Sequence, residues 1–467
     1  MNTRNESVDA LRGFAILTMI LSGSIAFGDV LPAWMYHAQV PPPLHKFNPQ
    51  IAGITWVDLV FPFFLFSLGA AIPLAFHNKI KEGASFISIS TIAIKRFLLL
   101  AFFALFTQHM KAWVIAENPK TKEHLLSLLS FILLFFQFYE NKTPKYKKLF
   151  LALKILSFIV AILLLFILPF WKSTGFDFYK SDIILMVLAN MALFGVLIYY
   201  FTYNNSLLRI GILPFIMAIF LAAKEPSNGF AKSIFNFNEL AGYKFDWLYK
   251  FYFLKYLFII IPGTIAGDIL VKNTTEKVEK LSTKNNLLTS ILLFAIVFNV
   301  YALFTRQLSL NIIITAITAL ISIKYLVENN TKSTQNQFTK IGFYLLLLGL
   351  FFEAYEGGIK KDSSTYSYYF VTSGLAFLSL IVFDNFSASS ISKSFTQFFA
   401  INGKNPMVAY VAGSLILLPI LSITNTKPLF DSLSTNAFTG FLKGILFTGL
   451  VSLITVFFVK QKWFWKT

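Results

Sequence analysis

"GITWVDLVFPFFLFSLGAAIPLAF", from Gly53 to Phe76, is an apolar run that contains a single acid, Asp58, near its start. A helix of about 20 such residues crosses a hydrocarbon core about 30 Å thick. Runs of this kind recur from one end of the chain to the other, whereas a transmembrane barrel would show alternating segments of about 10 residues. The repetition therefore predicts an all-α polytopic membrane protein.

Composition supports the same class. The chain has 467 residues, of which 56% are hydrophobic and 13% charged, while soluble domains carry about 25% charged residues. The formal charge of +18 comes from lysine clusters between apolar runs, and such clusters usually mark the cytoplasmic side of a membrane. We therefore expect the lipid bilayer, and no nucleic acid, as a partner. The chain lacks cysteine, which excludes disulfides, thiolate metal sites and cysteine nucleophiles.

The apolar runs form one integral-membrane domain, residues 1–467, with about 12 to 14 transmembrane helices. Basic loops follow the second, fourth and eighth runs, so an even number of spans places both termini in the cytoplasm. Residues 224–250 carry four lysines in a connection that parity places outside, and we expect an extramembrane or interfacial insertion there. The expected spans lie near 10–28, 54–76, 92–109, 123–139, 149–170, 182–203, 207–223, 251–271, 287–304, 308–326, 338–356, 366–384, 400–422 and 440–459.

Ionisable residues inside these runs cost several kcal/mol unless they are paired or hydrated. Asp9 and Arg12 are three residues apart and share one face of the first helix. They either belong to an ordinary helix start with a snorkelling arginine, or Arg12 faces an interior vestibule and binds a phosphate. Arg96, at the start of the third span, is by itself typical of a cytoplasmic anchor.

The loop before Asp58 contains two histidines. In "HAQVPPPLHK", three prolines stiffen the chain between His37 and His45. Imidazole exchanges a proton near neutral pH, with an unperturbed pKa of about 6.5, and a buried acid can orient it. Asp58 is the acid in reach of this loop, although a loop histidine can simply bond a backbone carbonyl. The other outward histidines lack metal-ligand spacing, so we expect no metal site.

"INGKNPMVAY", residues 401–410, interrupts an otherwise apolar run with glycine, asparagine and proline. Irregular backbone at membrane depth is tolerated only where it lines a cavity or is buried in protein. A half-helix beginning there would offer free N–H groups, with Asn405, to an anion or a carbonyl oxygen. Alternatively, a helix simply begins near Pro406.

Several short motifs follow one another along the chain: "SVDALRGFAILTMIL", "GITWVDLVFPFFLFSLGAAIPL", "KRFLLL", "PGTIAGDIL", "NPMVAY" and "WFWK". In this order they resemble the motifs of the heparan-α-glucosaminide N-acetyltransferase family and its bacterial relatives, and the likeness is strongest over residues 1–110. The resemblance implies a transmembrane acetyltransferase in the bacterial inner (cytoplasmic) membrane that moves an acetyl group from cytosolic acetyl-CoA to a glucosamine-type amine on the extracytoplasmic side. By family habit we expect a homodimer.

By this resemblance the catalytic histidine is His45, with His37 in reserve, acting as a general base or as an acetyl carrier. The other residues that it assigns to the site are Asp58 and Asn405 as catalytic, and Asp9, Arg12 and Arg96 as donor-binding. Lys361 is a further donor-binding candidate. The chain departs from the family in lacking an "LQRLG"-like segment and in having about four additional spans. A secondary transporter is the alternative, but such proteins usually contain two similar halves, and no internal repeat is visible.

Overall fold

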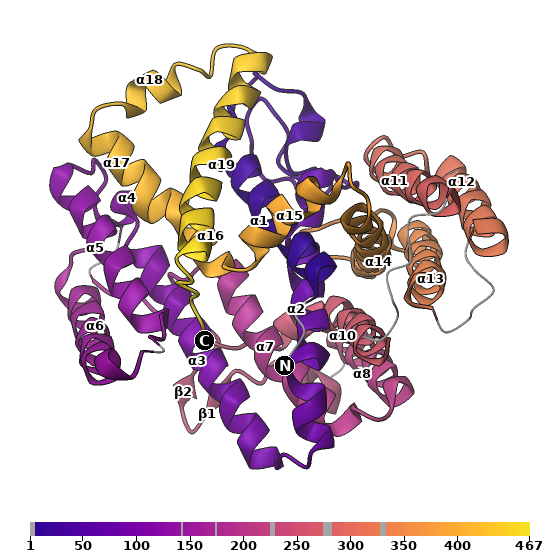
Figure 1. The fold of residues 1–467 in the computed structure, drawn as a ribbon, viewed down its shortest axis with the longest axis horizontal. Coiled ribbons are helices and arrows are strands. Elements are labelled where there is room, and N and C mark those ends of the chain that lie inside the picture. Colours follow the sequence, from indigo (N-terminus) through magenta and orange to yellow (C-terminus); the bar gives the residue numbers. More distant parts are fainter. Residues whose placement is uncertain (1–4, 142, 173–174, 225–228, 274–282, 327–332) are drawn as a thin grey trace.

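The computed structural model describes residues 5–141, 143–172, 175–224, 229–273, 283–326 and 333–467. Within these residues the protein is an all-α polytopic membrane protein with twelve helices long and apolar enough to cross a bilayer (Figure 1). The twelve are α2 (Trp56–Lys81), α3 (Phe86–His109), α5 (Thr121–Phe138), α6 (Lys147–Ile167), α7 (Ile183–Thr202), α8 (Ser206–Lys224), α10 (Leu257–Lys272), α11 (Thr283–Phe304), α13 (Thr334–Glu356), α14 (Tyr366–Ala388), the pair α16 (Pro406–Ala412) and α17 (Leu418–Ile423), and α19 (Ala437–Lys460).

Two of the fourteen expected spans fall outside this set. The first is helix α1 (Glu6–Ser24), which carries the three charged residues Glu6, Asp9 and Arg12 in its first two turns. The tenth is α12 (Leu308–Ile321), an apolar helix that is shorter than the others. The predicted range of 12 to 14 helices is therefore confirmed. The shorter elements are η1 (Ala33–Met35), α4 (Ala112–Ile115), η2 (Pro144–Tyr146), α9 (Phe230–Phe235), β1 (Glu239–Leu240), β2 (Tyr243–Lys244), η3 (Phe251–Tyr256), the π turns η4 (Ser322–Leu326) and η5 (Gly413–Leu417), α15 (Lys393–Gly403) and α18 (Lys427–Asp431).

Glycines allow α2 and α10 to pack backbone against backbone. A Cβ added at Gly69 would lie 2.5 Å from the carbonyl oxygen of Ile260, and one at Gly267 would lie 2.4 Å from that of Ala70. Small residues spaced four apart commonly make such close crossings in membranes. The glycines of "PGTIAGDIL" therefore fix α10 against α2, the helix that carries Asp58.

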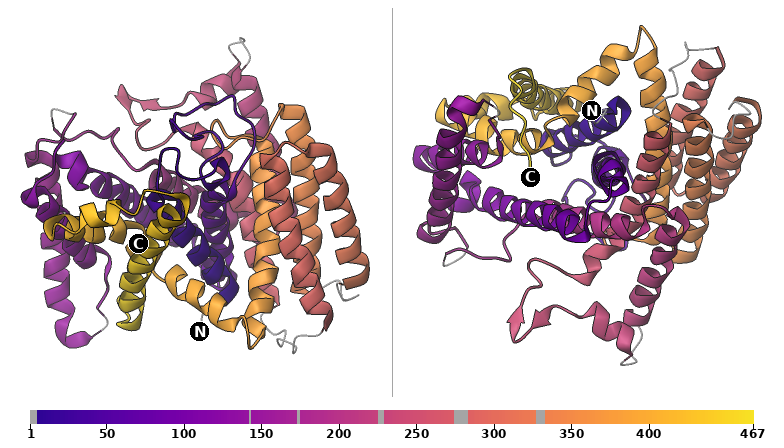
Figure 2. Two further views of the ribbon diagram at one scale, coloured as in Figure 1. Left: turned by 90° about the horizontal axis from the view of Figure 1, so that it is seen from above. Right: turned by 60° about the horizontal axis from the view of Figure 1, so that its bottom comes forward.

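Helices α11 to α14 stand side by side on one flank of the bundle (Figure 2, left, salmon to orange). Helix α14 is the most enclosed element, because its whole apolar window is buried inside the protein. In the same view the loop between α1 and α2 lies at the end of the bundle opposite the N-terminus. The lipid-facing surface is thus supplied by the outer helices, and α2 and α14 form the interior.

One short segment contacts both ends of the chain. The guanidinium of Arg12, near the start of α1, donates to the carbonyl of Gly403 at 3.5 Å. Two residues later, Asn405 donates to the carbonyl of Trp463 in the C-terminal tail at 2.8 Å. The common cytoplasmic side expected for the two termini stays a prediction.

The run expected at 400–422 is divided. Helix α15 ends at Gly403, Pro406 is the first residue of α16, and α17 follows a π turn. The membrane-crossing part begins at Pro406 because proline is favoured at the first helical position, where its missing N–H would be unpaired in any case. A single span starting at residue 400 was therefore wrong, and the interruption at residues 403–406 is confirmed.

Residues 229–250 lie between α8 and α10 and contain α9 and the antiparallel pair β1–β2. Both strands are exposed. The segment docks on the connection before α7, where the Tyr179 hydroxyl donates to Asp246 at 2.7 Å and Trp247 packs on Phe178 with ring centroids 4.5 Å apart. This connection holds no candidate span within its described residues. The extramembrane or interfacial insertion expected at 224–250 stays a prediction.

Candidate functional site

The first turn of α2 fixes the carboxylate of Asp58. Thr55 is the N-cap residue, and its side chain accepts a hydrogen bond from the Val57 N–H at 3.2 Å. In return the Thr55 N–H donates to Asp58 Oδ2 at 2.9 Å, which completes a capping box. The negative charge also suits the positive end of the helix dipole. Asp58 is completely buried, so its position is set by the helix start itself.

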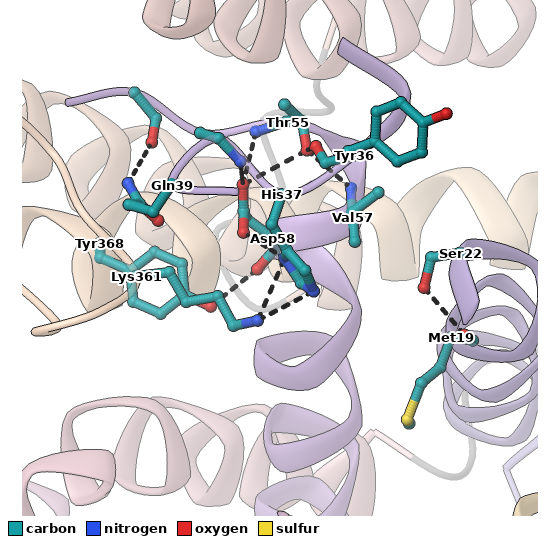
Figure 3. Close-up of polar contacts among 12 residues, drawn as sticks. Met19, Ser22, Tyr36, His37, Gln39, Thr55, Val57, Asp58, Lys361 and Tyr368 are labelled. Carbon is teal, nitrogen blue, oxygen red and sulfur yellow. Dashed lines mark hydrogen bonds and ion pairs between the residues drawn. The ribbon is translucent and has the colours of Figure 1, made fainter. Parts of the chain in front are cut away.

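His37 pairs with this buried carboxylate. Its Nδ1 lies 2.8 Å from Asp58 Oδ1, and the following N–H, of Ala38, donates to Oδ2 at 3.2 Å. The side chain of His37 is 38% exposed while that of Asp58 is 0% exposed. The result is an accessible imidazole held from below by a buried acid (Figure 3).

Lys361 completes the cluster from the other half of the chain. Its Nζ lies 3.2 Å from Nδ1 and 3.3 Å from Nε2 of His37, 324 residues away in sequence. With the Nδ1 proton donated to Asp58, Nε2 keeps a lone pair, and the Lys361 ammonium is a donor within its reach. Figure 3 shows the lysine side chain reaching the imidazole beside Asp58.

Backbone contacts bring the Lys361 turn to the loop before α2. The N–H of Gly53 donates to the carbonyl of Ile359 at 2.7 Å. Gly358 has a φ of +128°, and a Cβ there would lie 2.3 Å from the Cβ of Ala52. A side chain at residue 358 would therefore separate the two segments and withdraw Lys361 from His37.

Two tyrosines brace the site. The Tyr368 hydroxyl, on α14, donates to the backbone carbonyl of Asp58 at 2.7 Å. The Tyr36 hydroxyl donates to Ala26 at 2.6 Å, and the Thr55 hydroxyl donates to the Tyr36 carbonyl at 2.7 Å. Burial raises the pKa of the Tyr36 phenol above its ordinary value, so the hydroxyl stays protonated and remains a donor at neutral pH. The loop beside His37 is thereby held at both ends.

His45 occupies a different environment. Its Nε2 accepts from the Gly28 N–H at 2.9 Å, and its Nδ1 lies 3.3 Å from the carbonyl of Val40. Its ring packs edge-on against Tyr36, with centroids 4.5 Å apart. Within the described residues the Asp58 carboxylate is bonded by His37, Ala38 and Thr55. The expected partnership of an imidazole with Asp58 is present, but it belongs to the histidine held in reserve.

Arg12 and Asp9 lie deeper in the bundle. Arg12 bonds Asp9 at 3.3 Å and both the hydroxyl and the carbonyl of Ser67, at 3.4 and 3.3 Å. Ser67 is nine residues beyond Asp58 on α2, or about 13 Å along the helix axis. Arg12 therefore links α1, α2 and α15, and its side chain is 16% exposed. The structure does not bring Arg12 and Asp9 to the His37 cluster.

Asn405 and Arg96 also lie apart from the cluster. The Asn405 amide donates to the Trp463 carbonyl and accepts from the Trp465 N–H at 3.2 Å, so both of its ends hold the C-terminal tail. Arg96 lies within α3, and its Nε is buried with no hydrogen-bond partner among the described residues. In the same described part of the chain, no group of three or more histidine and acidic residues is placed to hold a metal ion.

A second polar cluster was missed by the sequence reasoning. Arg209, completely buried on α8, bonds Asp268 at 2.7 Å, and the Tyr199 hydroxyl bonds the same carboxylate at 2.9 Å. His77 Nδ1 lies 3.1 Å from the Tyr199 oxygen. The signal was present in the sequence, because an arginine within the run 207–223 requires an intramembrane partner and "PGTIAGDIL" supplies an acid.

The fold and the site define a class: a polytopic membrane protein with a carboxylate–imidazole–ammonium cluster at the end of the bundle opposite the N-terminus. Over residues 4–270 the chain matches the family model described as a domain of unknown function (DUF5009). The match covers more than half of the chain, and the chain belongs to this family. It includes α1 to α10 with His37 and Asp58, and it ends before Lys361. No curated protein matches the sequence.

Proposed function

We propose that the protein is a transmembrane N-acetyltransferase that moves an acetyl group from cytosolic acetyl-CoA to the amine of a glucosamine-type sugar on the extracytoplasmic side. The observation that carries the proposal is the 2.8 Å contact between His37 Nδ1 and the buried Asp58 carboxylate, beneath an exposed imidazole. Together with the motif resemblance, it favours a general base acting at a membrane surface.

His37 is the base in this proposal. Asp58 accepts the Nδ1 proton and so directs the basic lone pair of Nε2 outward. As the amine nitrogen attacks the thioester carbonyl carbon, Nε2 takes the proton that the nitrogen loses. The C–S bond then breaks, and the departing thiolate of coenzyme A receives the proton from His37. A positioned base of this kind contributes about 10² to 10⁴ in rate. In the variant route His37 first carries the acetyl group itself.

Lys361 acts on the developing oxyanion. Its ammonium lies 3.3 Å from Nε2, so a carbonyl being attacked beside that nitrogen would have its oxygen within reach of Nζ. Lys361 was expected to bind the donor, and its place beside the imidazole puts that role at the thioester end of the donor.

The donor's phosphates need cations nearer the cytoplasmic side. Arg96, with its unpaired Nε, is the residue proposed for this role, and Lys95 adjoins it. Arg12 and Asp9 support the donor path by holding α1 against α2. The bacterial inner membrane is the proposed location, because acetyl-CoA is cytosolic and the basic loops face the same side as the termini.

The test compares the two histidines of one loop. Wild-type protein and the His37→Ala and His45→Ala variants are reconstituted in liposomes with ¹³C-acetyl-CoA and glucosamine, and labelled N-acetylglucosamine is measured by mass spectrometry. We expect His37→Ala to lose about 10² to 10⁴ of the rate. His45→Ala, whose ring bonds only backbone and aromatic neighbours, should stay within about threefold. Equal activity of His37→Ala and wild type would refute the assignment of the base, and no product from wild type would refute the reaction.

A further inference from the structure

A cavity of about 670 Å³ lies apart from the His37 cluster, between the start of α5 and the segment α17–α18. Sites for small molecules usually have volumes of about 300 to 1,000 Å³. Helices α2 and α3 are joined by a short turn and run in opposite directions, so α4 and the start of α5 lie at the end of the bundle where α2 begins.

The charge of the cavity is positive. Among the described residues its lining contains Lys120, His124 and Lys427 and no carboxylate. Outside the lining, Asp431 is shared between two ammonium groups, at 2.5 Å from Lys427 and 3.0 Å from Lys443. Glu123, also outside the lining, accepts from the Lys120 N–H at 2.8 Å. These two acids stand against the three lysines Lys120, Lys427 and Lys443, which leaves a surplus positive charge at the cavity rim. A lining of this sign favours an anion.

The ring of His124 lines the same cavity. Its Nδ1 is shielded from water and has no hydrogen-bond partner among the described residues, so the ring nitrogen that a ligand in the cavity can approach is Nε2. His124 thus adds a second kind of hydrogen-bonding group to the two lysines.

The other residues that line the cavity are suited to a ligand with several hydroxyl groups. Trp113 is 43% exposed at the cavity and offers an aromatic face. Hydroxyl and amide side chains from η5, from α17 and from the residues after α17 also line the cavity, where they can exchange hydrogen bonds with alcohols. These residues are Ser414, Ser422 and Asn425.

We infer that this cavity binds a phosphorylated polyol, with the phosphate at Lys120, Lys427 and His124 and the carbon skeleton against Trp113. Lysine binds phosphate as a compact charge, and tryptophan with lysine is common at headgroup depth. The same chemistry is offered by a free glycerol phosphate and by the headgroup of phosphatidylglycerol. The inference does not depend on acetyl transfer.

The test uses the purified full-length protein in a neutral detergent. Thermal unfolding is followed with increasing sn-glycerol 3-phosphate, with glycerol as the uncharged control, and retention of added phosphatidylglycerol against phosphatidylcholine is measured by native mass spectrometry. A ligand that binds only the folded state raises Tm in a saturable way. A shift with the free phosphate identifies a soluble ligand, and selective retention of phosphatidylglycerol alone identifies the lipid; either outcome supports the site.

The variant Lys120→Gln/Lys427→Gln should weaken the binding at least about 30-fold, because two charge-assisted contacts are lost. Lys122→Gln is the matched control, since this lysine is in the same turn of α5 but outside the lining, and it should change affinity less than about twofold. Ser422→Asp, which adds a carboxylate to the wall, should also abolish binding. Equal binding by wild type and the double variant, or no saturable binding in either arm, would overturn the inference.

Discussion

Two clusters in this protein each contain a histidine, an acid and a cation. They differ in how far the cluster can be reached from outside the protein. In the cluster of His37, Asp58 and Lys361, the imidazole is 38% exposed and its cation comes from a distant turn. In the cluster of His77, Asp268 and Arg209, the cation is completely buried among helices. A polar group is available for chemistry only where one of its bonding positions can still be reached by a substrate.

The two clusters also differ in how many of their hydrogen-bonding positions are filled by other protein groups. The guanidinium of Arg209 bonds Thr202 through Nε and Nη2, each at 3.0 Å, and Thr264 and Asp268 through Nη1. Its plane also lies 4.5 Å from the centre of the Tyr199 ring. A buried ion pair that is satisfied in this way holds helices together, and removing one partner leaves a buried charge. Under the proposed function the first cluster is the reactive one, and the second holds helices together.

The largest effect is expected at Asp58. Asp58→Asn keeps the volume and still accepts from Thr55, so the helix start survives. An amide can donate to Nδ1, which favours the imidazole tautomer with the proton on Nε2 and removes the base. Acetyl transfer should fall about 10³- to 10⁴-fold while Tm changes little. The measurement is the rate of labelled product in liposomes, with circular dichroism as the control for folding. Full activity in Asp58→Asn would show that the carboxylate of Asp58 does not orient His37 for proton transfer.

The next effect is on stability. Arg209→Ala should destabilise the protein by about 3 to 5 kcal/mol, because Asp268 remains buried without its partner. Replacing both charges, in Arg209→Met/Asp268→Leu, should recover much of this loss. Unfolding midpoints in detergent measure both variants. A double variant that is less stable than Arg209→Ala would contradict the view that the unpaired Asp268 charge causes the loss of stability.

The smallest effect is expected at Lys361. Lys361→Met removes the ammonium but keeps a side chain of similar length, and we expect kcat to fall about 10²-fold with KM for the amine nearly unchanged. Lys361→Arg should recover part of the rate, because it restores the positive charge with a different geometry. Steady-state kinetics with both substrates check this outcome. A rise in KM with constant kcat would instead place Lys361 in ground-state binding.

The short motifs are widely separated in the sequence, and in the structure they are contact points between helices. In "SVDALRG", Gly13 meets α15, since a Cβ there would lie 1.8 Å from the carbonyl oxygen of Phe399. In "NPMVAY", Asn405 binds the backbone of "WFWK". Their residue types were readable in sequence, but their partners were not, because each bond joins segments tens to hundreds of residues apart.

The choice between the histidines shows the same limit. The sequence favoured His45 because it stands nearer to Asp58, yet the three prolines between the histidines shape a loop that returns His37 to the carboxylate and turns His45 toward Gly28. Proximity along a chain predicts contact within a helix, where the spacing of neighbours is fixed. In a loop it does not, since backbone direction depends on what the loop packs against.

By itself the sequence determined the class of protein, the approximate number of spans and the residues able to do chemistry, because the length and apolarity of a run are local properties matched to the thickness of a bilayer. Only the tertiary structure decided which imidazole meets Asp58 and that Lys361 joins it. Those contacts depend on the packing of α2 against α10 and of the Gly358 turn against Ala52, and such packing arises from many distant side chains acting together.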